Sequence, residues 1–170
     1  YFVMSENLNQ LRDSLKVLAS ETFSSVSAPI QYAAIAAYNN DHSEYINNSK
    51  NILKAVGEYV YNNLKSNNII INKPQGGFYL MPEFVNKNFS SSDEMCSDIL
   101  KKTGVALLPG SDFGFSKNKM IVRLSFTDFD GHTFMKNVSD TENIDDNLIS
   151  RFAPNIVDGV NKLKRWSEST

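Results

Sequence analysis

The N-terminal part of the chain changes its hydrophobic period once. Residues 1–4 form an apolar run typical of a buried strand, and the leucines at positions 8, 11, 15 and 18 then follow helical spacing. Residues 20–27 are polar and irregular. The run over 29–38 is small and apolar on nearly all sides, which is typical of helices that are buried or packed against another subunit. These patterns predict a strand followed by two helices.

The longest helical pattern covers residues 43–66, and short apolar runs alternate with helical stretches after it. Its predicted core stripe consists of Ile46, Ile52, Leu53, Val56, Val60 and Leu64. Strands are predicted over 69–71, 78–81, 105–108 and 120–126. The alternation of helices with short strands predicts an α/β chain with a short mixed sheet covered by helices.

The remaining helices are predicted from their ends. Ser91 and Glu94 have the spacing of a capping box, and Gly104 is a typical residue after the last helical turn. A closing helix is expected over 148–166, interrupted or restarted at Pro154. The polar stretch 128–147 carries no period from which an element can be predicted.

Composition is that of an ordinary globular domain, with 41% hydrophobic and 21% charged residues. The formal net charge is −2 and the charges are interspersed, which argues against a nucleic-acid partner. One cysteine and two histidines are too few for a disulfide framework or a zinc site. No apolar run approaches the roughly 20 residues of a membrane span, and no secretory pattern is present. We therefore expect a cytoplasmic protein without metal, membrane or nucleic-acid partners.

Common catalytic motifs are not found. The segment from Gly110 to Gly114 has the wrong spacing for a phosphate loop, and neither a G-x-G-x-x-G nor a G-x-S-x-G pattern occurs. Cys96 shares a helix face with Ile99 and Leu100, so it is interpreted as a small core residue.

Arg123 stands out within an apolar strand. Strict alternation over 120–126 places Val122, Leu124 and Phe126 on one face and Arg123 on the other. A buried guanidinium must find water, a carboxylate partner or an anionic ligand, because leaving it unpaired is costly. The residues alone favour a structural ion pair or a solvated edge. The planar fork also suits bidentate capture of a ligand carboxylate.

Three segments together resemble the C-terminal half of class I/II aminotransferases, the fold-type I pyridoxal-phosphate (PLP) enzymes. Ser24–Ala34 is similar to the S/P-x-Q-x-A-A helix start of that family, and Lys73–Leu80 resembles its P-x-G-G-F-Y turn and strand. Thr103–Gly114 followed by Val122–Phe126 resembles its G-V-x-x-x-P-G-x-x-F-G and v-R-l-s-f signatures. The order and spacing of the three segments make the resemblance strong.

The resemblance implies roles for particular residues. Arg123 matches the arginine that binds the α-carboxylate of the amino-acid substrate. Gly76 and Gly77 would permit a tight turn and a close backbone approach beside the site, although a plain turn explains them equally well. Ser111 and Phe113 lie in the loop that lines the substrate entrance in the family, with packing as the alternative.

The resemblance also implies the domain organisation and the cofactor. Residues 1–40 would be the last strand and closing helices of the large PLP-binding domain, and 41–170 the small C-terminal α/β domain. Family members attach PLP to a lysine in an S-K motif followed by R-x-G-Y, and Tyr1 is similar to that final tyrosine. No lysine here has this context. Lys50 does follow Ser49, but it lies within the long predicted helix and is interpreted as a solvated helix residue. The attachment lysine is therefore expected upstream, and the chain alone is expected to be inactive.

The implied activity is transfer of an amino group between an amino acid and a 2-oxo acid by a homodimeric enzyme, with residues 21–29 as candidates for reaching the partner's site. Two alternatives stay open. A PLP-dependent β-lyase or synthase of the same fold would share the carboxylate-binding arginine. A non-catalytic α+β binding module would use the small domain without chemistry.

Overall fold

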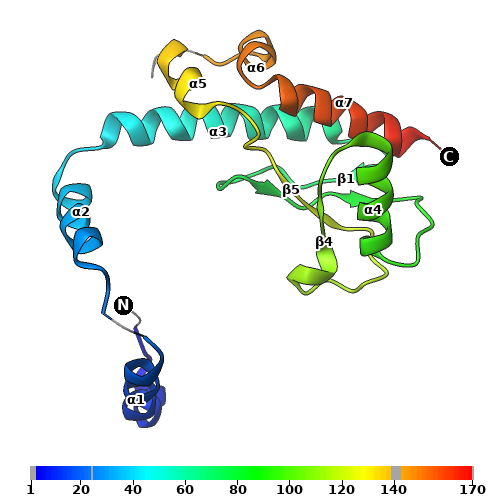
Figure 1. The fold of residues 1–170 in the computed structure, drawn as a ribbon. Coiled ribbons are helices and arrows are strands. Elements are labelled where there is room, and N and C mark those ends of the chain that lie inside the picture. Colours follow the sequence, from blue (N-terminus) through cyan, green and yellow to red (C-terminus); the bar gives the residue numbers. More distant parts are fainter. Residues whose placement is uncertain (1–2, 24, 139–142, 170) are drawn as a thin grey trace. The chain divides into compact units, whose positions relative to one another are not determined.

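The computed structural model describes residues 3–23, 25–138 and 143–169. Figure 1 shows the order of the elements along the chain. The chain divides into two compact units, Tyr1–His42 and Ser43–Thr170, and each is described by itself.

The first unit is helical. Its elements are the 3-10 helix η1 (Glu6–Leu11), α1 (Arg12–Thr22) and α2 (Ala28–Asn39). Pro29 occupies the first turn of α2, where its missing N–H costs no helical hydrogen bond. The leucine-based prediction of a helix is confirmed, but none of the residues of η1, α1 and α2 is buried.

The strand predicted over residues 1–4 is wrong for the described part of it. Val3 and Met4 lie outside any strand, and Val3 is 87% exposed. A strand is stable only when a neighbour satisfies its backbone groups, and no described residue pairs with these two. Residues 1–2 lie outside the described residues.

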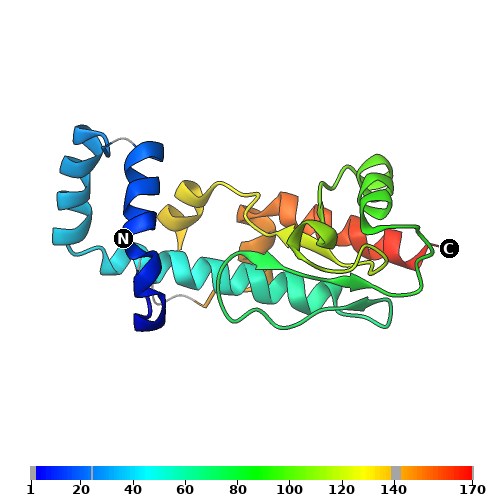
Figure 2. The same cartoon turned by 90° about the horizontal axis from the view of Figure 1, so that it is seen from below.

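The second unit combines long helices with short strands. Its helices are α3 (Ser43–Leu64), α4 (Ser92–Thr103), α5 (Gly131–Asn137), α6 (Asp146–Phe152) and α7 (Pro154–Glu168). The predicted restart at Pro154 is confirmed, with Ala153 between α6 and α7. Helix α7 lies along α3 in both views of the chain (Figures 1 and 2). No helix of the described residues is sufficiently long and apolar to cross a membrane.

Two small sheets complete this unit. Strand β1 (Ile69–Ile70) pairs with β3 (Glu83–Phe84), and β5 (Val122–Ser125) lies between β2 (Tyr79–Leu80) and β4 (Leu108–Pro109). The α/β fold class is confirmed, but the sheets differ from the predicted mixed sheet because all three pairings are antiparallel.

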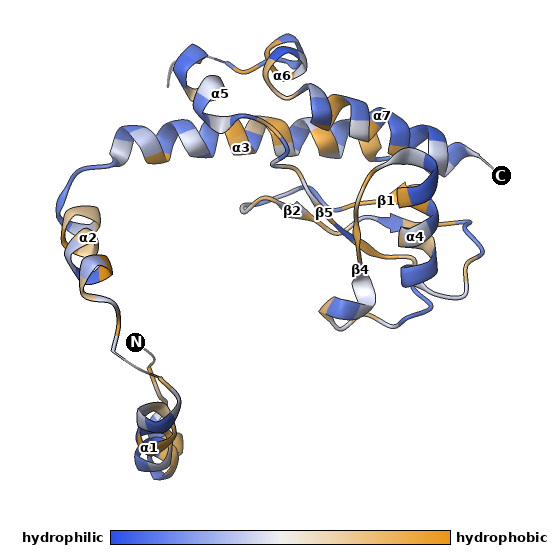
Figure 3. Cartoon of the chain, viewed as in Figure 1, coloured by the Kyte–Doolittle hydropathy of each residue, from blue (hydrophilic) through white to orange (hydrophobic). Residues whose placement is uncertain are grey.

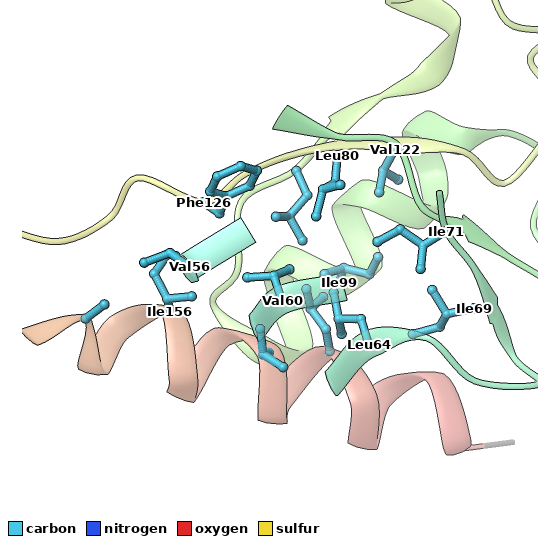
Figure 4. Close-up of a cluster of buried hydrophobic side chains, with 14 of the residues drawn as sticks. Val56, Val60, Leu64, Ile69, Ile71, Leu80, Ile99, Val122, Phe126 and Ile156 are labelled. Atoms are coloured by element: carbon cyan, nitrogen blue, oxygen red, sulfur yellow. The ribbon is translucent and has the colours of Figure 1, made fainter. Parts of the chain in front are cut away.

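The core lies between helices α3 and α7 and one face of the sheets. The buried apolar residues of the strands lie on that face. Figure 3 shows hydrophobic residues along the middle of α3 and along α7. Figure 4 shows Val56, Val60 and Leu64 of α3 in one buried cluster with Val122 and Phe126, in which Phe126 lies near Val56 and Val122 near Leu80. The predicted stripe is correct for Ile52, Val56, Val60 and Leu64, which are all buried. Leu53 packs at the edge of this core, while Ile46 is 45% exposed, so the buried stripe begins later in α3 than predicted.

Other predicted boundaries are met in part. The Ser91 side chain caps α4 by accepting a hydrogen bond from the Glu94 backbone N–H at 3.2 Å. The Glu94 carboxylate, however, accepts from the backbone N–H of Ser90, not from that of Ser91. Within the unassigned stretch 128–147, Asp130 caps α5 through the N–H groups of His132 and Thr133. Residues 139–142 of that stretch lie outside the described residues.

Candidate carboxylate-binding site

Strand β5 determines where the Arg123 side chain lies. The alternation predicted from the sequence is present over residues 122–126, since Val122, Leu124 and Phe126 are buried and Arg123 is half-buried on the other face, but Ile121 before them is also buried. The burial of these three apolar neighbours fixes β5 against the core. Arg123 is therefore presented from a rigid element.

Two aromatic rings flank the Arg123 guanidinium. Its Cζ lies 4.4 Å from the centroid of the Tyr79 ring and 4.3 Å from that of the Phe113 ring. Tyr79 belongs to β2, whereas Phe113 ends the 3-10 helix η2 (Gly110–Phe113) that follows β4. One ring therefore comes from a strand paired with β5, and the other from the helix that follows the strand paired with its opposite edge.

Arg123 is not held in an ion pair within the described part of the chain. Across residues 3–23, 25–138 and 143–169, no carboxylate oxygen lies within 4.0 Å of its guanidinium. The structural ion pair left open by the sequence is thus not found among the described residues, and β5 is the central strand of its sheet, not an edge. The cation–π contacts leave its N–H groups able to donate to an anionic ligand.

Ser111 lies near Phe113 but serves to anchor η2. Its hydroxyl donates to the Asp93 carboxylate at 3.3 Å and accepts from the Ser92 hydroxyl at 3.4 Å. These contacts attach η2 to the first turn of α4. In addition, the backbone N–H of Gly110 donates to the Ile121 carbonyl oxygen at 2.8 Å.

Gly76 and Gly77 line a different hollow. They lie in the turn before β2, and Gly77 has a φ of +70°, a conformation that glycine adopts readily. The cavity there has a volume of about 470 Å³, and Arg123 is not among its lining residues. Its walls are formed by Lys50, Leu53, Lys54, Glu58, Pro74, Gln75, Gly76, Gly77 and Phe126. The structure thus brings Phe113 to Arg123 and leaves the two glycines in a separate cavity.

Sequence reasoning missed Tyr79 as a partner of Arg123. The contact between Tyr79 and Arg123 follows from the register of the β2–β5 pair. In that register Tyr79 lies opposite Ser125, two positions from Arg123. That register is set by tertiary packing and cannot be read from the separate strand segments.

Comparison with known proteins assigns the family. The sequence model of the family Aminotransferase class I and II matches residues 1–131. The chain belongs to this family. The aspartate aminotransferase of Bacillus sp. (strain YM-2) is 35% identical over 102 residues, which are 57% of this chain and 26% of the relative. That of Sulfolobus acidocaldarius is 25% identical over 169 residues, which are 97% of this chain and 37% of the relative.

Solved aminotransferases have the same fold. The alanine aminotransferase of Pyrococcus furiosus superposes with a TM-score of 0.68 at 22% identity, covering 96% of this chain and 35% of that protein. The aspartate aminotransferase of Thermotoga maritima gives a TM-score of 0.63 at 22% identity, covering 94% and 34% respectively. This aminotransferase chain therefore spans about a third of the length of those structures. The resemblance inferred from the three motifs is confirmed.

Membership of the family implies PLP dependence in general, so the donors of the chain can be compared with those that PLP needs. The cavity beside Gly76 contains Lys50 and Lys54, both exposed on α3. Its carboxylate, Glu58, is ion-paired with Lys73 at 2.9 Å, and this hydrogen bond holds the pKa of Glu58 below its ordinary value. These residues do not fit PLP, because the one acid that could face the pyridine nitrogen is already paired.

A reactive cysteine and a metal cluster would be two other kinds of site among the described residues. Burial, the largest cause, raises the pKa of the Cys96 thiol to about 11, so it is protonated at neutral pH and is a poor nucleophile. Among the described residues, no group of three or more His, Cys, Asp or Glu side chains could hold a metal ion.

Proposed function

We propose that the protein containing this chain transfers an amino group between an amino acid and a 2-oxo acid, and that Arg123 binds the carboxylate of both. The observation that carries the proposal is a half-buried guanidinium between two aromatic rings, without an acidic partner in the described part, in a member of the aminotransferase family. The aspartate aminotransferases to which the chain is similar support this substrate class.

The chemistry follows from the shape of the side chain. A guanidinium presents a planar fork of N–H donors that matches the two oxygens of a carboxylate. A substrate held by two parallel hydrogen bonds loses rotational freedom, so the orientation of its Cα–H bond is fixed before the reaction begins. Arg123 therefore acts by binding and orientation, and the proton transfer is assigned to none of the described residues.

The cofactor and the assembly are part of the same proposal. The cofactor is PLP, held by residues other than those of the Gly76 cavity. The protein is a cytoplasmic homodimer. Its single cysteine is free and buried, in keeping with a reducing compartment, and the apolar α2 has no buried residue within its own unit.

The test is Arg123→Lys in the protein that contains the chain, assayed by steady-state amino-group transfer. Lysine keeps the charge but replaces the fork by a point charge, so kcat/KM is expected to fall roughly 100-fold through a higher KM and a lower kcat. Arg151→Lys, on the exposed side of α6, is the matched control and should leave both constants near wild type. Unchanged kinetics of the Arg123 variant would remove it from the site.

The reaction type is tested by product analysis with a cysteine conjugate and a 2-oxo acid acceptor. An aminotransferase converts the acceptor into an amino acid and releases no thiol. Release of a thiol without formation of a new amino acid would contradict the proposal and identify a β-lyase.

A further inference from the structure

The first of the two rings beside Arg123, that of Tyr79, is held by strand pairing. Tyr79 is fixed by the β2–β5 pairing, in which Tyr79 is opposite Ser125 and Leu80 opposite Leu124. Leu80 and Leu124 are buried, so this pairing is held by the core. The Tyr79 ring consequently belongs to the same rigid sheet as the guanidinium that it contacts.

The Phe113 ring is held by a separate set of contacts. Helix η2 is tied to α4 through the Ser111 hydroxyl and, through the Gly110–Ile121 hydrogen bond, to the residue that precedes β5. The helix ends at Gly114, whose φ of +86° favours glycine. Although Phe113 is 40% exposed, it is carried by an element anchored at both its start and its middle.

We propose that Tyr79 and Phe113 are positioning residues of the carboxylate site, which hold the Arg123 fork so that its N–H edge meets the ligand. This inference rests on the proposed function. The Arg123 side chain has many rotamers, and ordering it on binding would weaken the affinity for the substrate. Two rings at 4.4 and 4.3 Å restrict the guanidinium before the substrate arrives. Ring contacts to the guanidinium carbon leave its N–H edge able to donate, and that edge is where a carboxylate binds.

The two rings differ in what they can contribute. The Tyr79 hydroxyl makes no hydrogen bond with any of the described residues, so its contribution to Arg123 comes from the ring. Phenylalanine should therefore replace Tyr79 without loss, whereas leucine should not. At position 113 the ring is already that of phenylalanine, and leucine removes the π face while keeping most of the volume.

The experiment compares Phe113→Leu, Tyr79→Leu and Tyr79→Phe in the protein that contains the chain. Phe115→Leu is the matched control, because Phe115 lies in the same loop, is equally exposed at 40% and makes no cation–π contact with Arg123. We expect Phe113→Leu and Tyr79→Leu to raise the KM for the amino acid roughly tenfold with a much smaller change in kcat. Tyr79→Phe and Phe115→Leu should stay near wild type.

A second measurement does not depend on activity. In the 170-residue chain, the side-chain NMR signals of Arg123 should be displaced by the ring currents of its two neighbours. Phe113→Leu and Tyr79→Leu should each remove part of that displacement, and Phe115→Leu should not. Circular dichroism establishes that each variant is folded.

The outcomes separate this inference from the proposed function. If Arg123→Lys reduces turnover but Phe113→Leu behaves like Phe115→Leu, the positioning role is wrong and the function stands. If Tyr79→Phe is as impaired as Tyr79→Leu, the hydroxyl and not the ring is responsible, which also overturns the inference. If Arg123→Lys leaves amino-group transfer unchanged, Arg123 is not in the site and this inference fails with it, whereas a protein that transfers no amino group overturns the proposed function.

Discussion

At the scale of single residues, Asp98 shows how one carboxylate can join two helices. It accepts a hydrogen bond from the Trp166 indole N–H at 2.9 Å and is ion-paired with Lys102 at 3.0 Å. Lys87 lies over the same indole, 4.7 Å from the ring centroid, and donates to the Trp166 carbonyl at 3.0 Å. The indole hydrogen bond, followed by that of Lys102, lowers the pKa of Asp98. The middle of α4 is thereby joined to the last turns of α7 through the Asp98–Trp166 hydrogen bond.

The lowered pKa predicts how stability changes with pH. A carboxylate with a depressed pKa in the folded state stabilises the fold above its ordinary value of 3.8, and this contribution is lost as the pH falls through the folded-state pKa. Asp98→Asn should therefore lower the free energy of unfolding by about 1 kcal/mol at pH 7 and by much less at pH 3. Urea titrations at both pH values measure the difference. Asp128→Asn, at an exposed site, is the control. A loss that does not depend on pH would contradict the argument.

At the scale of elements, the tight contact between the start of η2 and Ile121, the residue before β5, explains why position 110 is glycine. A Cβ added to Gly110 would meet the Ile121 carbonyl oxygen at 2.8 Å and its Cβ at 3.0 Å, so backbone would have to move. Gly110→Ala should destabilise the chain by about 1–3 kcal/mol, as overpacking does elsewhere. Gly131→Ala is the matched control, since a Cβ there meets nothing within 4 Å and its φ is ordinary. Equal unfolding midpoints for the two variants would contradict this reading of the contact.

Elements with local signals could be predicted from the sequence, and elements defined by tertiary pairing could not. The ends of α4 follow from Ser91 and Gly104, because caps depend on a few adjacent residues. Strand β3 has two residues and exists through its pairing with β1, so no periodicity marks it. The same holds for the site, where Arg123 and Phe113 could be named from motifs but Tyr79 depends on register. The roles of these residues in binding stay predictions.

At the scale of the whole chain, the two units differ in how they are stabilised. Every buried hydrophobic residue of the described part lies between Ile52 and Trp166, and therefore within the second unit. The first unit leaves large apolar side chains exposed, such as Phe23, Tyr32 and Ile35. Sequence periodicity could predict its helices but could not show whether their apolar faces are covered. The assignment of residues 1–40 to a large domain and 41–170 to a small one stays a prediction.

This contrast predicts the pattern of amide hydrogen exchange. A helix that buries no side chain is marginal at about 12 residues, and its amides open with little cost in free energy. In the 170-residue chain, at concentrations where light scattering shows monomers, the amides of α1 and α2 should exchange at nearly intrinsic rates. Those of α3 around Val56 and Val60, which are fully buried, should exchange only through global unfolding. Similar protection of both units in the monomer would contradict this prediction, because helices without a buried side chain would then resist opening as strongly as the core.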